Sequence, residues 1–92
     1  MNITVALKNE KKRYEAAADG QLAGFISYEP EGDVLDLHHT EVFPEYEGQG
    51  VGTELVKQTL DLVRTIGKKV KPSCPFIKEY IDKNADYQDL LA

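Results

Sequence analysis

The sequence lacks several features that would place a protein in a specialised class. It contains a single cysteine, Cys74, so it can form neither an intrachain disulfide nor a zinc site built from several thiolates. With only two histidines beside that cysteine, we expect no metal site. No stretch approaches the roughly 18 apolar residues of a membrane span, and the first residues lack the basic and apolar regions of a signal peptide. These absences predict a cytoplasmic protein with no membrane partner.

Positive charge is also scarce. The 92 residues carry 11 Lys and Arg against 16 Asp and Glu, a net charge of -5. Because binding to a phosphate backbone depends on basic side chains, we expect no nucleic-acid partner. The acidic balance serves either solubility or the attraction of a cationic substrate such as an amine. The length and the 41% apolar content predict one globular domain over residues 1–92, and we expect a monomer or weak dimer.

The first half of the sequence alternates between apolar and polar residues, which predicts strands. The expected strands are Ile3–Leu7, Arg13–Ala18, Gln21–Tyr28 and Val34–Val42. Asp19-Gly20 suits a two-residue hairpin turn, and a second turn is expected over residues 29–33. Alternation places two sets of residues on opposite faces of the last strand: Leu35, Leu37, His39 and Glu41 on one, and Val34, Asp36, His38, Thr40 and Val42 on the other.

The second half has a helical period. Apolar residues recur three and four positions apart from Val51 to Ile66, and Gly67 is placed to end that helix. Lys69–Cys74 is a short strand candidate that Pro72 interrupts. Pro75 then suits the first turn of a second helix with one apolar face, formed by Phe76, Ile77, Tyr80 and Ile81. The expected fold is α/β of the α+β kind, with antiparallel strands followed by a helix, a parallel strand and a C-terminal helix.

Three glycines lie at alternate positions between the last antiparallel strand and the first helix. Gly48, Gly50 and Gly52 allow close approach of a ligand to the backbone. The helix that begins there directs unpaired N–H groups and its positive dipole end outward. The segment therefore indicates a phosphate or pyrophosphate site, unless the glycines serve only to reverse the chain. The spacing fits neither the P-loop nor the dinucleotide-binding fingerprint.

Together, three separated segments resemble the GNAT superfamily of acetyl-CoA-dependent N-acetyltransferases, in particular its small single-domain YjdJ-type branch. They are His39–Val42, the glycine loop with Leu55 on the helix behind it, and Pro72–Phe76. The family loop has the form Q/R-x-x-G-x-G/A, which Gly50 and Gly52 match. Glu47 replaces the usual Gln or Arg, so its carboxylate either turns to solvent or weakens coenzyme binding by repelling the pyrophosphate.

The resemblance implies a GNAT-like mixed sheet and transfer of an acetyl group from acetyl-CoA to a primary amine, without a metal. The acceptor is a small-molecule or protein amine. The coenzyme-binding residues would come from the strand and the loop: Thr40, Val42 and Phe43, then Gly48, Gln49, Gly50, Val51, Gly52 and Thr53. The Val42 amide would polarise the thioester carbonyl. A non-catalytic acyl-CoA-binding or protein-interaction module on the same fold is the alternative.

Four residues are candidates for the catalytic chemistry. His39 and Glu41 lie two residues apart, and histidine suits proton transfer near neutral pH. His39 is either the general base or a polar residue at the end of the sheet, and Glu41 is the base, orients His39 or lies harmlessly at the surface. Cys74 is either a nucleophile at a helix N-terminus or a small buried hydrophobic residue. Tyr80 is either the acid that protonates the coenzyme thiolate or part of the core.

Overall fold

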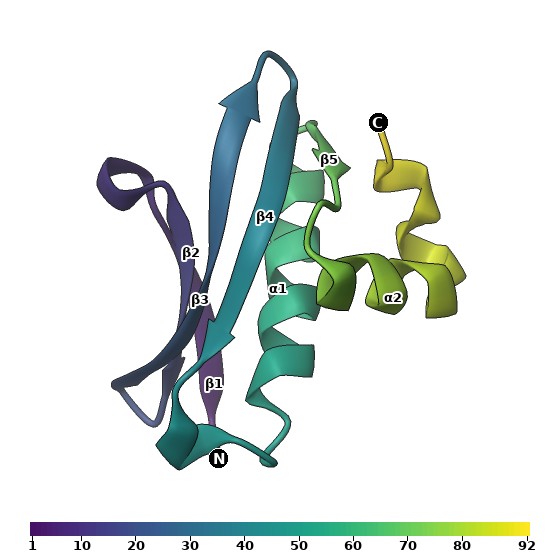
Figure 1. The fold of residues 1–92 in the computed structure, drawn as a ribbon. Coiled ribbons are helices and arrows are strands. Elements are labelled where there is room, and N and C mark those ends of the chain that lie inside the picture. Colours follow the sequence, from purple (N-terminus) through teal and green to yellow (C-terminus); the bar gives the residue numbers. More distant parts are fainter.

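The computed structural model describes residues 1–92 as five strands and two α-helices with short 3-10 turns between them (Figure 1). The strands are β1 (Ile3–Lys8), β2 (Arg13–Ala18), β3 (Gln21–Glu31), β4 (Val34–Val42) and β5 (Lys69–Lys71). The helices are α1 (Val51–Thr65) and α2 (Pro75–Lys83), and the 3-10 turns are Asn9–Lys11, Pro44–Tyr46 and Ala85–Leu90. The predicted order of elements is confirmed.

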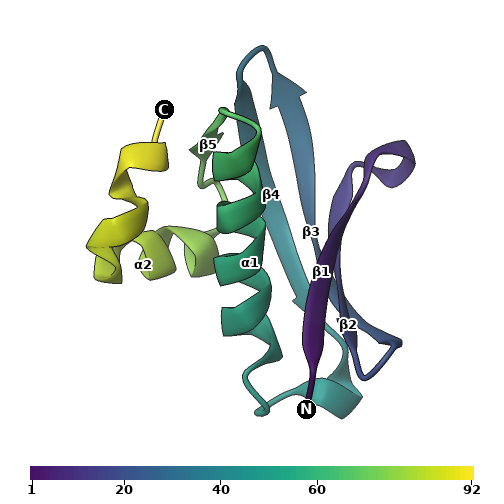
Figure 2. The same cartoon turned by 180° about the vertical axis from the view of Figure 1, so that it is seen from behind.

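The strands form one mixed sheet in the order β1-β2-β3-β4-β5. The first four are antiparallel, and β5 runs parallel to β4 after the crossover through α1, as the sequence predicts. α1 packs along one face of the sheet and α2 lies beside α1, whereas no helix covers the other face (Figures 1 and 2). No helix has both the length and the apolar content needed to span a lipid bilayer.

A single cluster of 18 buried residues holds the sheet and the helices together. Leu55 and Leu60 of α1 are fully buried against the sheet, and Ile77 and Ile81 bring α2 into the same cluster. Burying one such side chain contributes about 1.5–3 kcal/mol. The cluster therefore fixes the start of α1 next to the end of β4, where the glycine loop joins them.

The C-terminal end of α1 is closed by the expected glycine. Gly67 has φ +72°, and the N–H groups of Gly67 and Lys68 donate to the carbonyls of Arg64 and Val63, a Schellman arrangement that satisfies the last helical carbonyls. The expectation that the helical apolar period extends to Ile66 is wrong. The helix ends at Thr65, and Ile66 is 50% exposed.

The largest differences from the predicted strand boundaries are at the ends of β3 and β5, and a proline lies near each. β3 continues through Pro30 to Glu31, although residues 29–33 were expected to form a turn. β2 pairs with β3 only as far as Ser27. No β2 residue therefore lies opposite Pro30, and its lack of an N–H group costs the sheet no hydrogen bond to β2. β5 ends at Lys71 rather than continuing to Cys74, because Pro72 cannot donate a ladder hydrogen bond.

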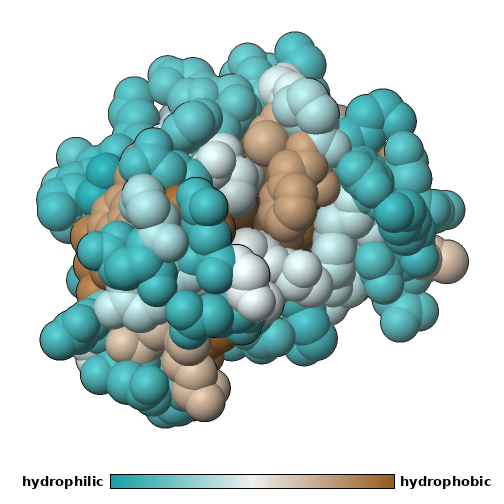
Figure 3. Space-filling view, turned by 60° about the horizontal axis from the view of Figure 1, so that its bottom comes forward, coloured by the Kyte–Doolittle hydropathy of each residue, from teal (hydrophilic) through white to brown (hydrophobic).

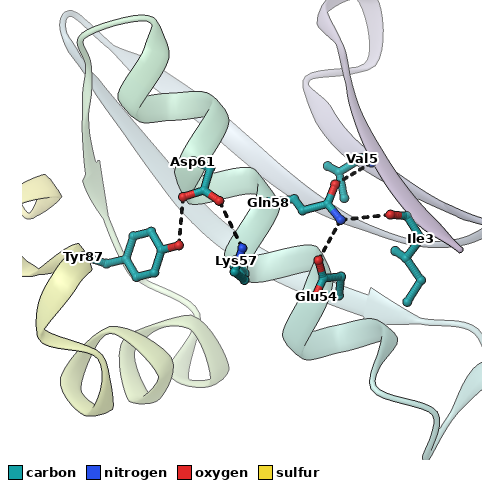
Figure 4. A network of polar contacts seen from close by, with 7 residues as sticks. All are labelled: Ile3, Val5, Glu54, Lys57, Gln58, Asp61 and Tyr87. Carbon is teal, nitrogen blue, oxygen red and sulfur yellow. Dashed lines mark hydrogen bonds and ion pairs between the residues drawn. The ribbon is translucent and has the colours of Figure 1, made fainter.

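Gln58 of α1 covers the outer edge of β1. Its Oε1 accepts from the Val5 N–H at 3.2 Å, and its Nε2 donates to the Ile3 carbonyl at 2.9 Å (Figure 4). Glu54 accepts a further bond from the same amide at 2.8 Å. Unpaired backbone groups on an edge strand can pair with another chain, so one side chain both joins β1 to α1 and blocks that edge.

Replacing Gln58 with leucine is expected to lower the free energy of unfolding by about 1–3 kcal/mol, because two partly buried backbone groups lose their partners. Urea unfolding measures the change, and sedimentation velocity reports any self-association through the free β1 edge. Lys57→Leu, at an exposed neighbouring position of α1, is the matched control. Equal stability of the two variants would show that Gln58 does not hold the edge.

The C-terminal turn is attached to α1 by a polar network. The Tyr87 hydroxyl donates to Asp61 Oδ1 at 2.8 Å (Figure 4), and Arg64 binds both oxygens of Asp89 at 2.6 and 3.0 Å. Burial, followed by the hydrogen bond to Asp61, raises the pKa of Tyr87 to about 12. Burial, with a smaller contribution from Tyr28, also raises the pKa of Tyr14 to about 12.

These two tyrosines predict a loss of stability at alkaline pH. Each has a folded-state pKa above the ordinary 10.0, so its contribution is complete below about pH 10 and is lost as the pH rises towards about 12. Unfolding free energies measured between about pH 9 and pH 11.5 should fall, and Tyr14 and Tyr87 should each contribute up to about one proton to the slope. In Tyr87→Phe the slope should drop by about one proton, and an unchanged slope would contradict this assignment.

Candidate functional site

The glycine loop and the first turn of α1 form a set of backbone donors. Gly50 is the N-cap of α1 with φ +81°, and no side chain caps the helix. The first helical bond is made by Glu54 to the Gly50 carbonyl. The N–H groups of Val51, Gly52 and Thr53 therefore have no partner within the protein. Together with the positive dipole end of a 15-residue helix, they offer a site for a phosphate group.

A groove runs from this loop to the start of α2. It has a volume of about 270 Å³, and Val42, Gly52 and Phe76 contribute to its walls together with the loop. A neighbouring hollow of about 200 Å³ shares Thr53 and Phe76 and extends along α2. Figure 3 looks towards this end of the molecule, where apolar and neutral residues lie in a depression between hydrophilic surfaces. The groove is therefore apolar inside and has backbone donors at its rim.

Gly52 determines how closely the groove wall packs. A Cβ at this position would lie 3.3 Å from Phe76 Cζ and 3.4 Å from Val42 Cγ2, so a side chain would press on both walls. At Gly48 and Gly50 a Cβ would meet nothing within 4 Å, but both residues have a positive φ. The loop thus uses glycine for backbone conformation at two positions and for close packing at the third.

Half of β4 has an unpaired edge. β5 pairs only with Val34–Asp36, and the Cys74 N–H then donates to the Leu37 carbonyl at 3.0 Å. Beyond Leu37 no strand neighbours β4 on that side. The Phe43 N–H donates towards β3, and backbone groups alternate along a strand. The amide groups of Thr40 and Val42 therefore point to the unpaired edge, which an extended ligand can pair with.

A β-bulge corrects the prediction for the faces of β4. Ser27 pairs with His39 and Tyr28 pairs with Leu37, so His38 is an extra residue in the ladder. The bulge reverses the alternation. Leu35 and Leu37 face the core, whereas His39 is exposed. The expectation that these leucines share a face with His39 and Glu41 is therefore wrong, although His39 and Glu41 do share one.

His39 and Glu41 lie together on the face of the sheet that no helix covers. His39 Nε2 is 3.3 Å from Glu41 Oε1, and both side chains are about half exposed. The Phe25 ring lies 6.0 Å from the imidazole and 6.4 Å from the Phe43 ring, centroid to centroid. On the other side, the Arg13 guanidinium lies 4.1 Å from the Phe25 centroid. A histidine with a carboxylate partner beside aromatic rings can accept a proton from a bound amine.

Cys74 lies on the other side of β4, among the core residues. It is 8% exposed and forms the N-cap of α2. Its Sγ donates to Thr40 Oγ1 at 3.4 Å, and no basic side chain forms a hydrogen bond with it. The strand β4 separates this thiol from His39 and Glu41, so the structure brings the predicted catalytic residues together as one pair and not as one cluster.

Tyr80 lies in the hollow along α2. It shares this hollow with Phe76 and Thr53, and its ring is 5.8 Å from that of Tyr87. Burial raises its pKa, and Lys57 of α1 partly opposes this shift. The hydroxyl therefore stays protonated at neutral pH, as a proton donor requires. It faces α1, on the side of the fold away from His39.

Of the remaining predicted coenzyme-binding residues, Gly48 lines the groove, whereas Gln49 and Phe43 do not. Glu47 and Gly48 line it beside Tyr46. The Glu47 side chain is exposed, whereas the Gln49 amide donates to the Glu45 carbonyl at 3.1 Å. Phe43 contacts Phe25 on the uncovered face and is not among the residues that line the groove.

Sequence reasoning missed Phe76 as a site residue. Its helical spacing indicated a core position, but the side chain is 44% exposed and lines both hollows of the groove. The signal that could have identified it is its position in the first turn of α2. Residues there lie beside the unpaired edge of β4 rather than under the sheet.

Comparison with known proteins gives this arrangement a family context. A family model described as GCN5-related N-acetyl-transferase matches residues 13–90. The solution structure of a GCN5-like protein from Staphylococcus aureus is 26% identical and aligns with a TM-score of 0.72, covering 99% of this chain and 89% of that one. The PaiA N-acetyltransferase of Thermoplasma acidophilum, solved in complex with coenzyme A, is 25% identical with a TM-score of 0.53, over 61% of this chain and 35% of that one.

A curated relative gives a shorter match. Protein NATD1 of Homo sapiens is 37% identical over 51 residues, which is 55% of this chain and 45% of that protein. The chain spans about half the length of the curated relatives that it matches.

Proposed function

The chain belongs to the GCN5-related N-acetyltransferase family, and from this premise we propose that it transfers an acetyl group from acetyl-CoA to a primary amine. One observation carries the proposal. The unpaired N–H groups of Val51–Thr53 and the unpaired edge of β4 open onto the same groove. A pyrophosphate needs the first feature, and an extended amide-containing arm needs the second.

The residues present suit this donor. Gly50 leaves the helix N-terminus free of a capping side chain, so a phosphate group can occupy that place. The amide of Thr40 or Val42 can bond the arm that carries the thioester. The Val42 N–H would then donate to the thioester carbonyl as its oxygen gains negative charge. Glu47 is exposed, which leaves its carboxylate free to turn away from the phosphates.

The proposed chemistry follows from the two sides of β4. The neutral amine forms an N–C bond with the acetyl carbonyl while the C–S bond breaks. The proton lost by the amine passes to His39, which Glu41 orients. The departing thiolate takes a proton from Tyr80, directly or through water. The products are an N-acetylated amine and free coenzyme A.

The uncovered face of the sheet is the proposed path of the acceptor. His39 and Glu41 lie there, and α1 and α2 pack elsewhere. The Glu41 carboxylate attracts a protonated amine before it loses its proton, and the net charge of -5 favours its approach. We therefore propose that the amine approaches from the face of the sheet opposite α1.

Direct attack by the amine is favoured over an acyl-cysteine intermediate. A nucleophilic thiol needs an activating base or cation, and the polar side-chain partner of Cys74 is the Thr40 hydroxyl. Cys74→Ala is expected to retain the rate of acetyl transfer within about threefold, since its loss removes packing rather than chemistry. Intact-protein mass spectrometry should show no acetylated enzyme. A loss of activity of about 100-fold or more, with an acetylated wild-type chain, would support the covalent path.

A thiol-release assay tests the proposed activity. The purified chain is incubated with acetyl-CoA and a panel of primary amines, including small amines, lysine peptides and peptides with free N-termini. Amine-dependent release of coenzyme A, with an acetylated product seen by mass spectrometry, supports the proposal. Binding of acetyl-CoA without transfer to any amine would favour an acyl-CoA-binding module, and no binding would favour a protein-interaction module.

A further inference from the structure

A second pocket lies at the end of the sheet opposite the glycine loop. It has a volume of about 310 Å³ and opens between the β1–β2 connection, the β3–β4 hairpin and the residues that follow α1. This is near the lower limit of pockets that hold small molecules. The pocket lies at the C-terminal end of α1, whereas the proposed coenzyme site lies at the N-terminal end of the same helix (Figures 1 and 2).

The base of this pocket contains a tyrosine hydroxyl that no other protein group binds. Tyr14 is only 1% exposed and lines the pocket, and no protein group forms a hydrogen bond with its hydroxyl. This oxygen is not among the fully buried polar atoms that lack a partner, so it can be reached from the pocket. The neighbouring Tyr28 ring is 5.5 Å away, but its hydroxyl donates to Asn9 Oδ1 at 3.2 Å. The free Tyr14 O–H remains protonated at neutral pH because burial raises its pKa to about 12.

The rim of the pocket combines apolar surface with positive charge. Leu7 and Ile66 are 37% and 50% exposed there, two of the few large apolar residues that the fold leaves in solvent. Lys12 and Lys68 also line the pocket. Their ammonium groups make only long contacts of 3.4 Å, to Glu29 Oε1 and to the Gly32 carbonyl. One carboxylate thus faces two lysines, which leaves a net positive charge at the rim.

We propose that this pocket binds a small carboxylate with an apolar body. The Tyr14 hydroxyl and the Lys68 ammonium would bind the carboxylate, while Leu7 and Ile66 would cover the apolar part. A cationic ligand would be repelled by the lysines, and a neutral apolar ligand would displace water from the Tyr14 hydroxyl without replacing its hydrogen bond. The pocket is separate from the groove at the glycine loop, so the proposal does not depend on acetyl transfer.

Chemical-shift titration of the ¹⁵N-labelled full chain tests this proposal, with 3-phenylpropionate as the probe and 3-phenylpropan-1-ol as its uncharged analogue. We expect saturable shifts at Leu7, Lys12 and Lys68. The carboxylate should bind more tightly than the alcohol by about tenfold to a hundredfold, the equivalent of one hydrogen bond to a charged group. Equal affinity for the two probes, or shifts confined to the glycine loop, would overturn the proposal.

Two pairs of variants identify the groups involved. Tyr14→Phe keeps the buried ring and removes only the hydroxyl, and it should weaken 3-phenylpropionate binding by about threefold or more. Tyr87→Phe, a tyrosine in the C-terminal turn, should leave that affinity unchanged. Lys68→Gln should also weaken binding, whereas Lys78→Gln on the exposed face of α2 should not. Unchanged affinity in both Tyr14→Phe and Lys68→Gln would refute the assigned site.

Discussion

Gly50→Glu is expected to reduce affinity for acetyl-CoA by about 100-fold or more, equivalent to about 2.7 kcal/mol. Gly50 has φ +81°, a conformation that costs a residue with a Cβ about 1–2 kcal/mol. The new carboxylate would also stand at the unpaired N–H groups of α1, where it would compete with a phosphate and repel it. Calorimetric titration of each variant with acetyl-CoA measures the loss.

The matched control is Gly32→Glu. Gly32 also has a positive φ, +65°, and a Cβ there would meet nothing within 4 Å. It belongs to the β3–β4 hairpin at the other end of the sheet, so this variant carries the same strain and charge away from the loop. We expect it to bind acetyl-CoA as the wild type does. Equal losses in the two variants would mean that strain, and not the phosphate site, explains the effect.

His39→Gln is expected to lower kcat by about 10²–10⁴-fold, the usual contribution of a general base. Glutamine keeps a polar side chain on the uncovered face but cannot take up the proton from the amine. The affinity for acetyl-CoA should change little, because His39 lies on the opposite side of β4 from the residues that line the groove. Steady-state rates with a saturating amine, together with the calorimetric affinity, separate these two effects.

The bulge supplies a control for this prediction. His38 is the exposed extra residue of β4, so His38→Gln makes the same chemical change one residue away. It should retain the wild-type rate. Glu41→Gln should lower kcat less than His39→Gln and shift the pH profile, since a carboxylate that orients the imidazole does not itself take the proton. If His38→Gln lost as much activity as His39→Gln, His39 would not be the base.

Local patterns in the sequence predict most of the fold. Strand alternation, the Asp19-Gly20 turn and the helical period from Val51 determine elements whose residues are neighbours along the chain. The glycine loop and Gly67 were identified because glycine marks a positive φ, which the structure shows at Gly48, Gly50 and Gly67. Such features depend on short-range geometry, so one sequence is enough to find them.

The errors concern features that neighbouring strands and helices impose. Nothing in the His38-His39 dipeptide shows which histidine is extra, because the bulge depends on the pairing of β4 with Ser27 and Tyr28 of β3. The contact of Cys74 with Thr40 joins residues 34 positions apart. Phe76 fits a helical apolar face by its spacing. Its side chain lines the groove only because α2 packs beside β4. The pairing of His39 with Glu41 was predictable, but the face on which they lie was not.

The most direct test of the proposed coenzyme site is a titration of the ¹⁵N-labelled chain with acetyl-CoA, followed by amide chemical shifts. We predict saturable shifts at two places, the first turn of α1 from Val51 to Thr53 and the unpaired edge of β4 at Thr40 and Val42. The amides around Tyr14 at the far end of the sheet should not move. Absence of saturable shifts, or shifts that leave both the first turn of α1 and the β4 edge unaffected, would contradict the proposed coenzyme site and the acetyl transfer that depends on it.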